Sequence, residues 1–144
     1  MRPFALLALA LTLMVTGCGK SRTTNTLSGE FTTLAEKQEF LERYMKFRRS
    51  YDDLHYRLSY IDGGGGMVPG PTEWNVRILA LVPAGELDEW IDGLSVTSDP
   101  ELDWVSEIPN APTDLEGFRW YEGDRVIVGI DRENRVVLYW NHAS

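Results

Sequence analysis

Residues 117–140 read Gly-Phe-Arg-Trp-Tyr-Glu-Gly-Asp-Arg-Val-Ile-Val-Gly-Ile-Asp-Arg-Glu-Asn-Arg-Val-Val-Leu-Tyr-Trp. This stretch holds three runs rich in branched and aromatic residues, at 117–121, 125–130 and 135–140. The runs are separated by Glu-Gly-Asp and by Asp-Arg-Glu-Asn, which are residues that favour tight turns. The stretch therefore predicts three consecutive antiparallel strands and makes a sheet the basis of the fold.

Two further strands are expected upstream. Residues 54–60 alternate between apolar and polar side chains, which is the two-residue period of a half-buried strand. Residues 74–82 are rich in branched side chains and stop before Pro83, so we expect them to form a central strand.

A long helix is expected before these strands. Residues 33–36, Thr-Leu-Ala-Glu, have the spacing of a capping box. An apolar stripe at intervals of four and three then continues through Phe40, Tyr44, Phe47, Tyr51 and Leu54. The end of this helix stays open, because the alternation of residues 54–60 begins where the stripe ends.

A second, short helix is expected at residues 86–94, where Leu87, Trp90, Ile91 and Leu94 share one face. Residues 95–116 contain three prolines and show no sustained period, so they are expected to be an irregular connection. The predicted fold is α+β: an antiparallel sheet of about five strands, with the long N-terminal helix and the short helix packed on one face.

Composition limits the classes of function. The 144 residues are 43% hydrophobic and 25% charged, which is typical of one globular domain. There are 14 Lys and Arg against 22 Asp and Glu, with a pI near 4.7. An acidic protein is a poor ligand for polyphosphate, so we expect no nucleic-acid partner.

The N-terminus has the pattern of an export signal. Arg2 precedes an apolar run at residues 4–15, which is too short to span a bilayer. The block that follows, Val15-Thr16-Gly17-Cys18, resembles the lipobox of bacterial lipoproteins. The resemblance implies cleavage before Cys18, acylation of this only cysteine, and anchoring in a membrane. Gly19 implies the periplasmic face of the outer membrane, since this family usually retains Asp at that position in the inner membrane.

The expected organisation follows from this signal. Residues 1–17 are the signal peptide, residues 18–30 are the lipidated cysteine and a flexible tether, and residues 31–144 are a single α+β domain. The tether is expected because the residues after Cys18 are rich in Thr, Ser, Asn and Gly.

Residues 62–74, Asp-Gly-Gly-Gly-Gly-Met-Val-Pro-Gly-Pro-Thr-Glu-Trp, are the most unusual stretch of the chain. They lack the Gly-Lys-Ser/Thr of a phosphate-binding loop and the spacing of a dinucleotide fingerprint. They are either a long hairpin connection or a loop that presents apolar residues to a partner. The stretch resembles segments of small uncharacterised proteobacterial lipoproteins, for which no activity is implied. The candidate binding residues are Gly63, Gly64, Gly65, Gly66, Met67, Val68 and Pro69.

Acidic residues are concentrated in one segment. Residues 83–118 contain ten Asp and Glu and no Lys or Arg. Such a segment is either a solvated face or a surface that attracts a basic partner. The candidate residues are Glu86, Asp88, Glu89, Trp90 and Asp92. Asp99, Glu101 and Asp103 alternate as in some calcium loops, but the Gly and the distal Glu of an EF-hand are missing. We therefore expect no metal and no cofactor.

Catalytic candidates are few. The histidines are His55 and His142, and no Gly-x-Ser-x-Gly or His-Glu-x-x-His motif is present. The sequence therefore predicts a lipid-anchored periplasmic binding protein, of the inhibitor or immunity type, for a basic envelope-acting protein. One alternative is a structural accessory that binds through the edge of its sheet, and another is a hydrolase that uses His55 with Asp52 or Asp53.

Overall fold

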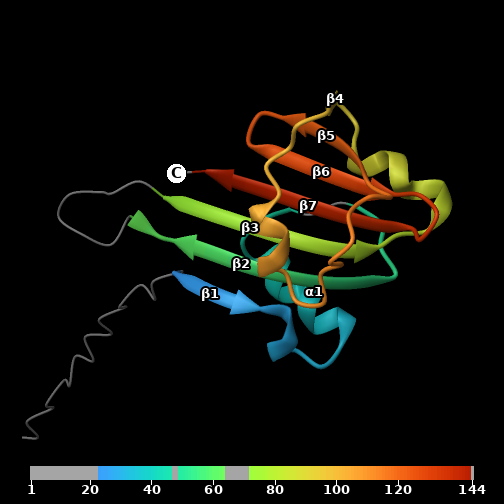
Figure 1. Cartoon of the computed structure of the whole chain (residues 1–144). Helices are drawn as coiled ribbons and strands as arrows, with labels where there is room; N and C mark the ends of the chain where they lie inside the picture. The colour runs from blue at the N-terminus through green and yellow to red at the C-terminus, as the bar shows by residue number, and fades with distance from the viewer. Residues whose placement is uncertain (1–22, 47–48, 64–71, 144) are drawn as a thin grey trace, which may run out of the picture.

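The computed structural model describes residues 23–46, 49–63 and 72–143. Seven antiparallel strands form one sheet in the order β1-β2-β3-β7-β6-β5-β4 (Figure 1). The strands are β1 (Thr24–Leu27), β2 (Asp53–Ile61), β3 (Glu73–Leu81), β4 (Ser95–Thr97), β5 (Arg119–Gly123), β6 (Val126–Asp131) and β7 (Val136–Ala143). The helices are η1 (Ser28–Glu30), α1 (Leu34–Glu42), η3 (Ala84–Trp90) and η4 (Asp103–Glu107), of which only α1 is an α-helix.

All five strands predicted from the sequence are confirmed. β5, β6 and β7 pair consecutively, as the turns between them predicted. β2 pairs with β3 along nine residues, and β3 then pairs with β7, which joins the two halves of the sheet. β3 therefore has a neighbour on each side.

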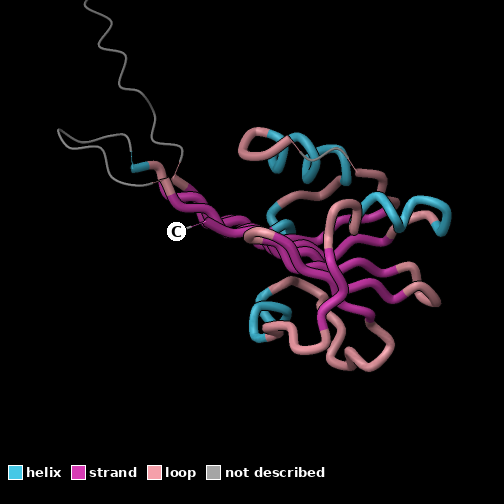
Figure 2. Tube along the Cα trace, turned by 90° about the horizontal axis from the view of Figure 1, so that it is seen from above, coloured by secondary structure: helices cyan, strands magenta, loops and turns pink. Residues whose placement is uncertain are grey.

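Both faces of the sheet are covered, as Figure 2 shows from above. On the first face, α1 and η3 cover a cluster that includes Leu54, Ile78 and Tyr139. On the second face, η4 and its flanking loops cover a smaller cluster of Trp104, Trp120 and Trp140. Neighbouring residues of β7 thus point into different clusters, which is why the strand is a nearly continuous apolar run.

The predicted fold class is wrong. The protein is mostly β, its sheet has seven strands and not five, and its helices are short and lie on both faces. The two strands that were missed, β1 and β4, have four and three residues and form the edges of the sheet. Strands this short contain too few residues to show a period.

The prediction of a long N-terminal helix is also wrong, although the predicted start of the helix is confirmed. The hydroxyl of Thr33 accepts from the amide of Glu36, whose carboxylate accepts from the amide of Thr33, so the capping box is formed. The α-helix ends at Glu42, and Leu54 at the end of the stripe belongs to β2. Asp52 and Asp53 would lie at the C-terminus of a longer helix, where the helix dipole opposes negative charge.

The predicted short helix is a seven-residue 3₁₀ helix, η3, which begins after Pro83. Leu87 and Trp90 are three residues apart and so share one side of a 3₁₀ helix. Both are buried in the first cluster. Residues 24–30, which the composition assigned to a tether, instead form β1 and η1.

The register defines two opposite ends of the sheet. At the first, here called the hairpin end, Thr24 pairs with Tyr60 and Ile61 pairs with Glu73. At the second, here called the far end, Asp53, Leu81, Val136 and Asp131 form one row across β2, β3, β7 and β6. The nine residues of β2 separate the two ends by about 30 Å.

Candidate functional site

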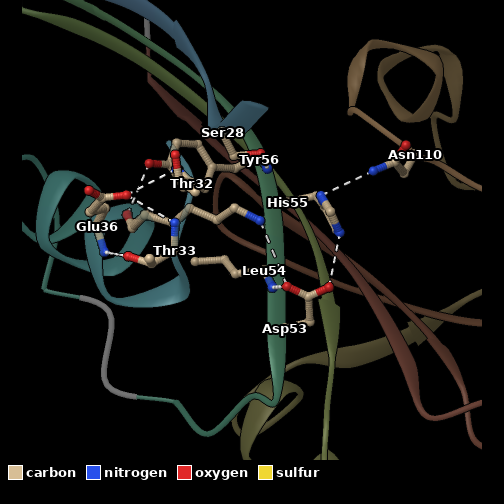
Figure 3. Close-up of polar contacts among 10 residues, drawn as sticks. Ser28, Thr32, Thr33, Glu36, Asp53, Leu54, His55, Tyr56 and Asn110 are labelled. Carbon is tan, nitrogen blue, oxygen red and sulfur yellow. Dashed lines mark hydrogen bonds and ion pairs between the residues drawn. The ribbon is translucent and has the colours of Figure 1, made fainter. Parts of the chain in front are cut away.

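The His55 side chain lies between two polar partners (Figure 3). Its Nε2 is 3.1 Å from Oδ2 of Asp53, and its Nδ1 is 3.2 Å from Nδ2 of Asn110. Strand alternation places Asp53 and His55 on the same side of β2, whereas Asn110 comes from the loop after η4. Burial alone would raise the pKa of Asp53, but the Leu54 amide and the charges of His55 and Lys37 lower it overall.

Both ring nitrogens of His55 have partners within the protein. A general base needs a ring nitrogen directed at the substrate. In His55 one nitrogen faces Asp53 and the other faces an amide donor, so both are occupied by the protein itself. The carboxylate that His55 contacts is Asp53, while Asp52 instead lies 3.8 Å from Arg135. We interpret Asp53, His55 and Asn110 as a structural contact, here called the brace, that links β2 to the loop after η4.

A second polar contact lies beside the brace. Arg57 and Arg77 are directly opposite each other on β2 and β3, and both reach Oε2 of Glu107, at 3.1 and 3.3 Å. Like charges that face each other across strands repel, and the shared carboxylate offsets this repulsion. Burial lowers the pKa of Arg77, while the charge of Glu107 raises it. Arg57, Arg77 and Glu107 were not among the residues predicted from the sequence, although the period of β2 already placed Arg57 on the side of His55.

The acidic segment divides between the two faces of the sheet. Glu86, Asp88 and Glu89 lie on η3, which packs into the first cluster, whereas Asp103 and Glu107 lie on η4, which packs into the second. The ten acids therefore do not form one continuous surface. Their adjacency in sequence is not adjacency in space, because β4 and its flanking turns lie between the two helices.

The candidate residues of η3 also differ among themselves. Trp90 is fully buried, and its indole nitrogen donates to the carbonyl oxygen of Ser50, so it is a core residue and cannot contact a partner. Asp88 pairs with Arg132 at 2.6 Å, yet 78% of its side chain is exposed. Glu89 accepts from the amide of Ser50. Asp92 follows in an exposed turn.

More acidic groups gather at the far end. A cavity of about 650 Å³ opens there, lined in part by Asp114, Asp131, Arg132 and Glu133. The Asp131 carboxylate accepts from the side chain and amide of Asn134 and from the amide of Glu133. The side-chain hydrogen bond from Asn134 is the main cause that lowers the pKa of Asp131.

The hairpin end carries a pocket of a different kind. Its volume is about 370 Å³, and its walls are Tyr44, Met45, Leu58, Tyr60, Trp74 and Val76. Three uncharged polar residues, Ser59, Thr72 and Asn141, complete the lining. We call this site the hairpin-end pocket. Among the described residues that line it, none is an Asp, Glu, Lys, Arg or His.

The two predicted binding regions lie at opposite ends of β3. Gly63 precedes this strand at the hairpin end, whereas η3 with Glu86, Asp88 and Glu89 follows it at the far end (Figure 1). Because about 30 Å of strand separates them, a small partner that contacts η3 cannot also contact Gly63. The remaining loop candidates, Gly64, Gly65, Gly66, Met67, Val68 and Pro69, lie outside the described residues, as does Cys18.

Residues 23–46, 49–63 and 72–143 contain no group of three or more His, Cys, Asp or Glu arranged to hold a metal ion. Within the same ranges, no helix has the length and apolar character needed to cross a membrane.

The chain was compared with protein-family models, with curated proteins and with solved structures, and none of them matches it.

Proposed function

We propose that the protein is a lipid-anchored periplasmic binding protein, of the inhibitor or immunity type, whose far end contacts a basic envelope-acting partner. The observation that supports this most strongly is the position of β1. Cys18 lies six residues before Thr24, which pairs with Tyr60 at the hairpin end. A lipid on Cys18 would hold the hairpin end near the membrane and leave the acidic far end directed away from it.

The charges at the far end fit a basic partner. The carboxylates of Glu86 and Glu133 make no hydrogen bond or ion pair within the described residues. Asp88 is paired with Arg132, but both side chains are more than half exposed, so a partner can reach them. Exposed charge of one sign speeds the encounter with a partner of opposite sign, and salt weakens the effect.

Trp90 is a core residue, so in this proposal the partner contacts only the acidic residues of the far end. The structural-accessory alternative receives less support, because the sheet edges, β1 and β4, offer four and three residues for pairing with another chain. The hydrolase alternative is disfavoured by the two occupied nitrogens of His55.

The test is capture of partners from envelope extracts by the mature lipidated protein. We compare it with a variant in which Glu86, Asp88, Glu89 and Asp92 are replaced by their amides. A matched control replaces Asp99, Glu101, Asp103 and Glu116, which removes the same charge elsewhere in the acidic segment. We expect a basic, salt-sensitive partner that the first variant loses and the control retains. An unchanged set of captured proteins in both variants would contradict the proposal.

A further inference from the structure

We propose that the hairpin-end pocket holds the hydrocarbon chain of a lipid drawn from the membrane next to it. This inference rests on the proposed lipid anchor for its choice of ligand. The pocket itself is a feature of the described residues and can be tested without the anchor.

The chemistry of the pocket favours an uncharged, apolar ligand. Three of its walls are the aliphatic side chains of Met45, Leu58 and Val76, and three are aromatic, Tyr44, Tyr60 and Trp74. Its volume of about 370 Å³ falls within the range of pockets that hold small ligands. A charged group would find no counter-ion among the lining residues that the structure describes, whereas an alkyl chain would find apolar contacts on several sides.

Two of the polar lining residues, Trp74 and Asn141, already have hydrogen-bond partners within the protein. The indole nitrogen of Trp74 donates to Oδ1 of Asn141 at 2.8 Å, and Nδ2 of Asn141 donates to the Tyr139 hydroxyl at 3.2 Å. These bonds satisfy Trp74 and Asn141 without a ligand. An alkyl chain would contact the faces of the aromatic rings and the apolar side chains of Met45, Leu58 and Val76.

The position of the pocket identifies the occupant. Tyr60 lines the pocket and is also the direct strand partner of Thr24. Six residues of extended chain span at most about 20 Å, so a lipidated Cys18 keeps the bilayer surface within that distance of Thr24. Tethering at this distance makes membrane lipid the apolar compound with the highest effective concentration at the pocket.

The experiment uses the mature lipidated protein in vesicles of phosphatidylethanolamine and phosphatidylglycerol. A fraction of the lipid carries a diazirine on the terminal carbon of one acyl chain. That carbon lies at the centre of the bilayer, so a domain that only touches the membrane surface cannot reach it. After illumination, mass spectrometry of peptides should find adducts on Tyr44, Tyr60 or Trp74. Adducts confined to the N-terminal residues overturn the proposal.

Two variants at the same end of the sheet sharpen this test. Met45→Phe fills part of the pocket and should lower adduct formation several-fold. The matched control, Ile61→Phe, adds an aromatic ring on the opposite face, where Ile61 is 47% exposed, and should leave adduct formation unchanged. If Met45→Phe does not fold, Thr72→Phe at the exposed rim replaces it. Equal adduct formation in the pocket-filling and control variants overturns the proposal.

A second arm of the experiment tests the pocket independently of acylation at Cys18. The full chain with Cys18→Ser is mixed in solution with palmitic acid that carries the same terminal diazirine. Adducts at Tyr44, Tyr60 or Trp74 support the pocket even if Cys18 proves not to be acylated. If the wild-type protein is acylated and the pocket takes no adduct in the first or the second arm, the inference is overturned and the anchor stands.

Discussion

The backbone amide of Asp62 donates a hydrogen bond to Oγ1 of Thr23 across 3.0 Å. The residue five positions after Cys18 is therefore fixed beside the point where β2 ends. This contact extends the pairing of β1 with β2 and places Thr23, the first described residue, at the hairpin end of the sheet (Figure 1). The orientation proposed for the protein at the membrane depends on this relationship.

Cys18→Ser removes the thiol that the lipobox resemblance identifies as the acyl acceptor. We expect loss of radioactive palmitate from the protein and its release from the membrane fraction. Metabolic labelling followed by fractionation measures both. Ser21→Ala, which alters the same segment and keeps the thiol, serves as the control. A Cys18→Ser protein that still incorporates palmitate contradicts the assignment of the anchor.

Gly129→Ala should destabilise the protein by about 1–3 kcal/mol, because there is no room for a side chain at this position. Trp120 is the direct cross-strand partner of Gly129, and its ring would lie 2.5 Å from an added Cβ. Urea unfolding followed by circular dichroism measures the change. Gly85→Ala, where nothing lies within 4 Å of an added Cβ, should change the free energy of unfolding by less than about 0.5 kcal/mol. Equal effects at the two positions would show that the packing described for Trp120 is wrong.

Asp131→Asn should reduce stability near neutral pH and have a smaller effect in acid. The folded-state pKa of Asp131 lies below that of the unfolded chain, chiefly because the Asn134 side chain donates to the carboxylate. The stabilisation is therefore complete above the unfolded-state pKa of about 3.9 and is lost as pH falls through the folded-state value. Urea unfolding of both proteins across this range measures the difference. A difference that grows on acidification contradicts the stated cause.

Glu107→Gln should cost about 1–2 kcal/mol of unfolding free energy. The carboxylate is shared by Arg57 and by Arg77, whose side chain is only 12% exposed, but Glu107 itself is 41% exposed and partly screened by water. Asp88→Asn provides the comparison, since it breaks the exposed pair with Arg132 and should cost less than about 0.5 kcal/mol. Chemical denaturation of both variants measures this contrast. A larger loss for Asp88→Asn would contradict the role assigned to Glu107.

Local sequence patterns predicted the five longer strands, because each of them buries side chains at a regular period. β2 alternates cleanly, and the turn residues around Asp131 and Asn134 set the β6–β7 hairpin. The N-terminal helix was overextended because an apolar residue such as Leu54 fits the end of a helical stripe and the start of a strand equally well. Only the pairing of Leu54 with Ala80 on β3 decides between them.

The second layer and the candidate site depend on long-range contacts that no local pattern shows. Trp104 and Trp140 stack with their ring centroids 5.7 Å apart, which brings an irregular segment onto the second face. The uninterrupted apolar run of β7 was a signal of burial on both faces. No such signal exists for the hairpin-end pocket, because Tyr44, Trp74 and Asn141 come from three distant parts of the chain. The division of the acidic segment between the two faces likewise follows from the order of the strands in the sheet.

The orientation of the domain can be measured directly. Since the thiol of Cys18 is expected to be blocked by lipid, a cysteine introduced elsewhere can be labelled selectively with a fluorescent donor. We compare Ile61→Cys at the hairpin end with Glu133→Cys at the far end, in vesicles whose lipid headgroups carry an acceptor. The proposal predicts strong energy transfer from position 61 and clearly weaker transfer from position 133. Equal transfer from both positions, or stronger transfer from position 133, would contradict it.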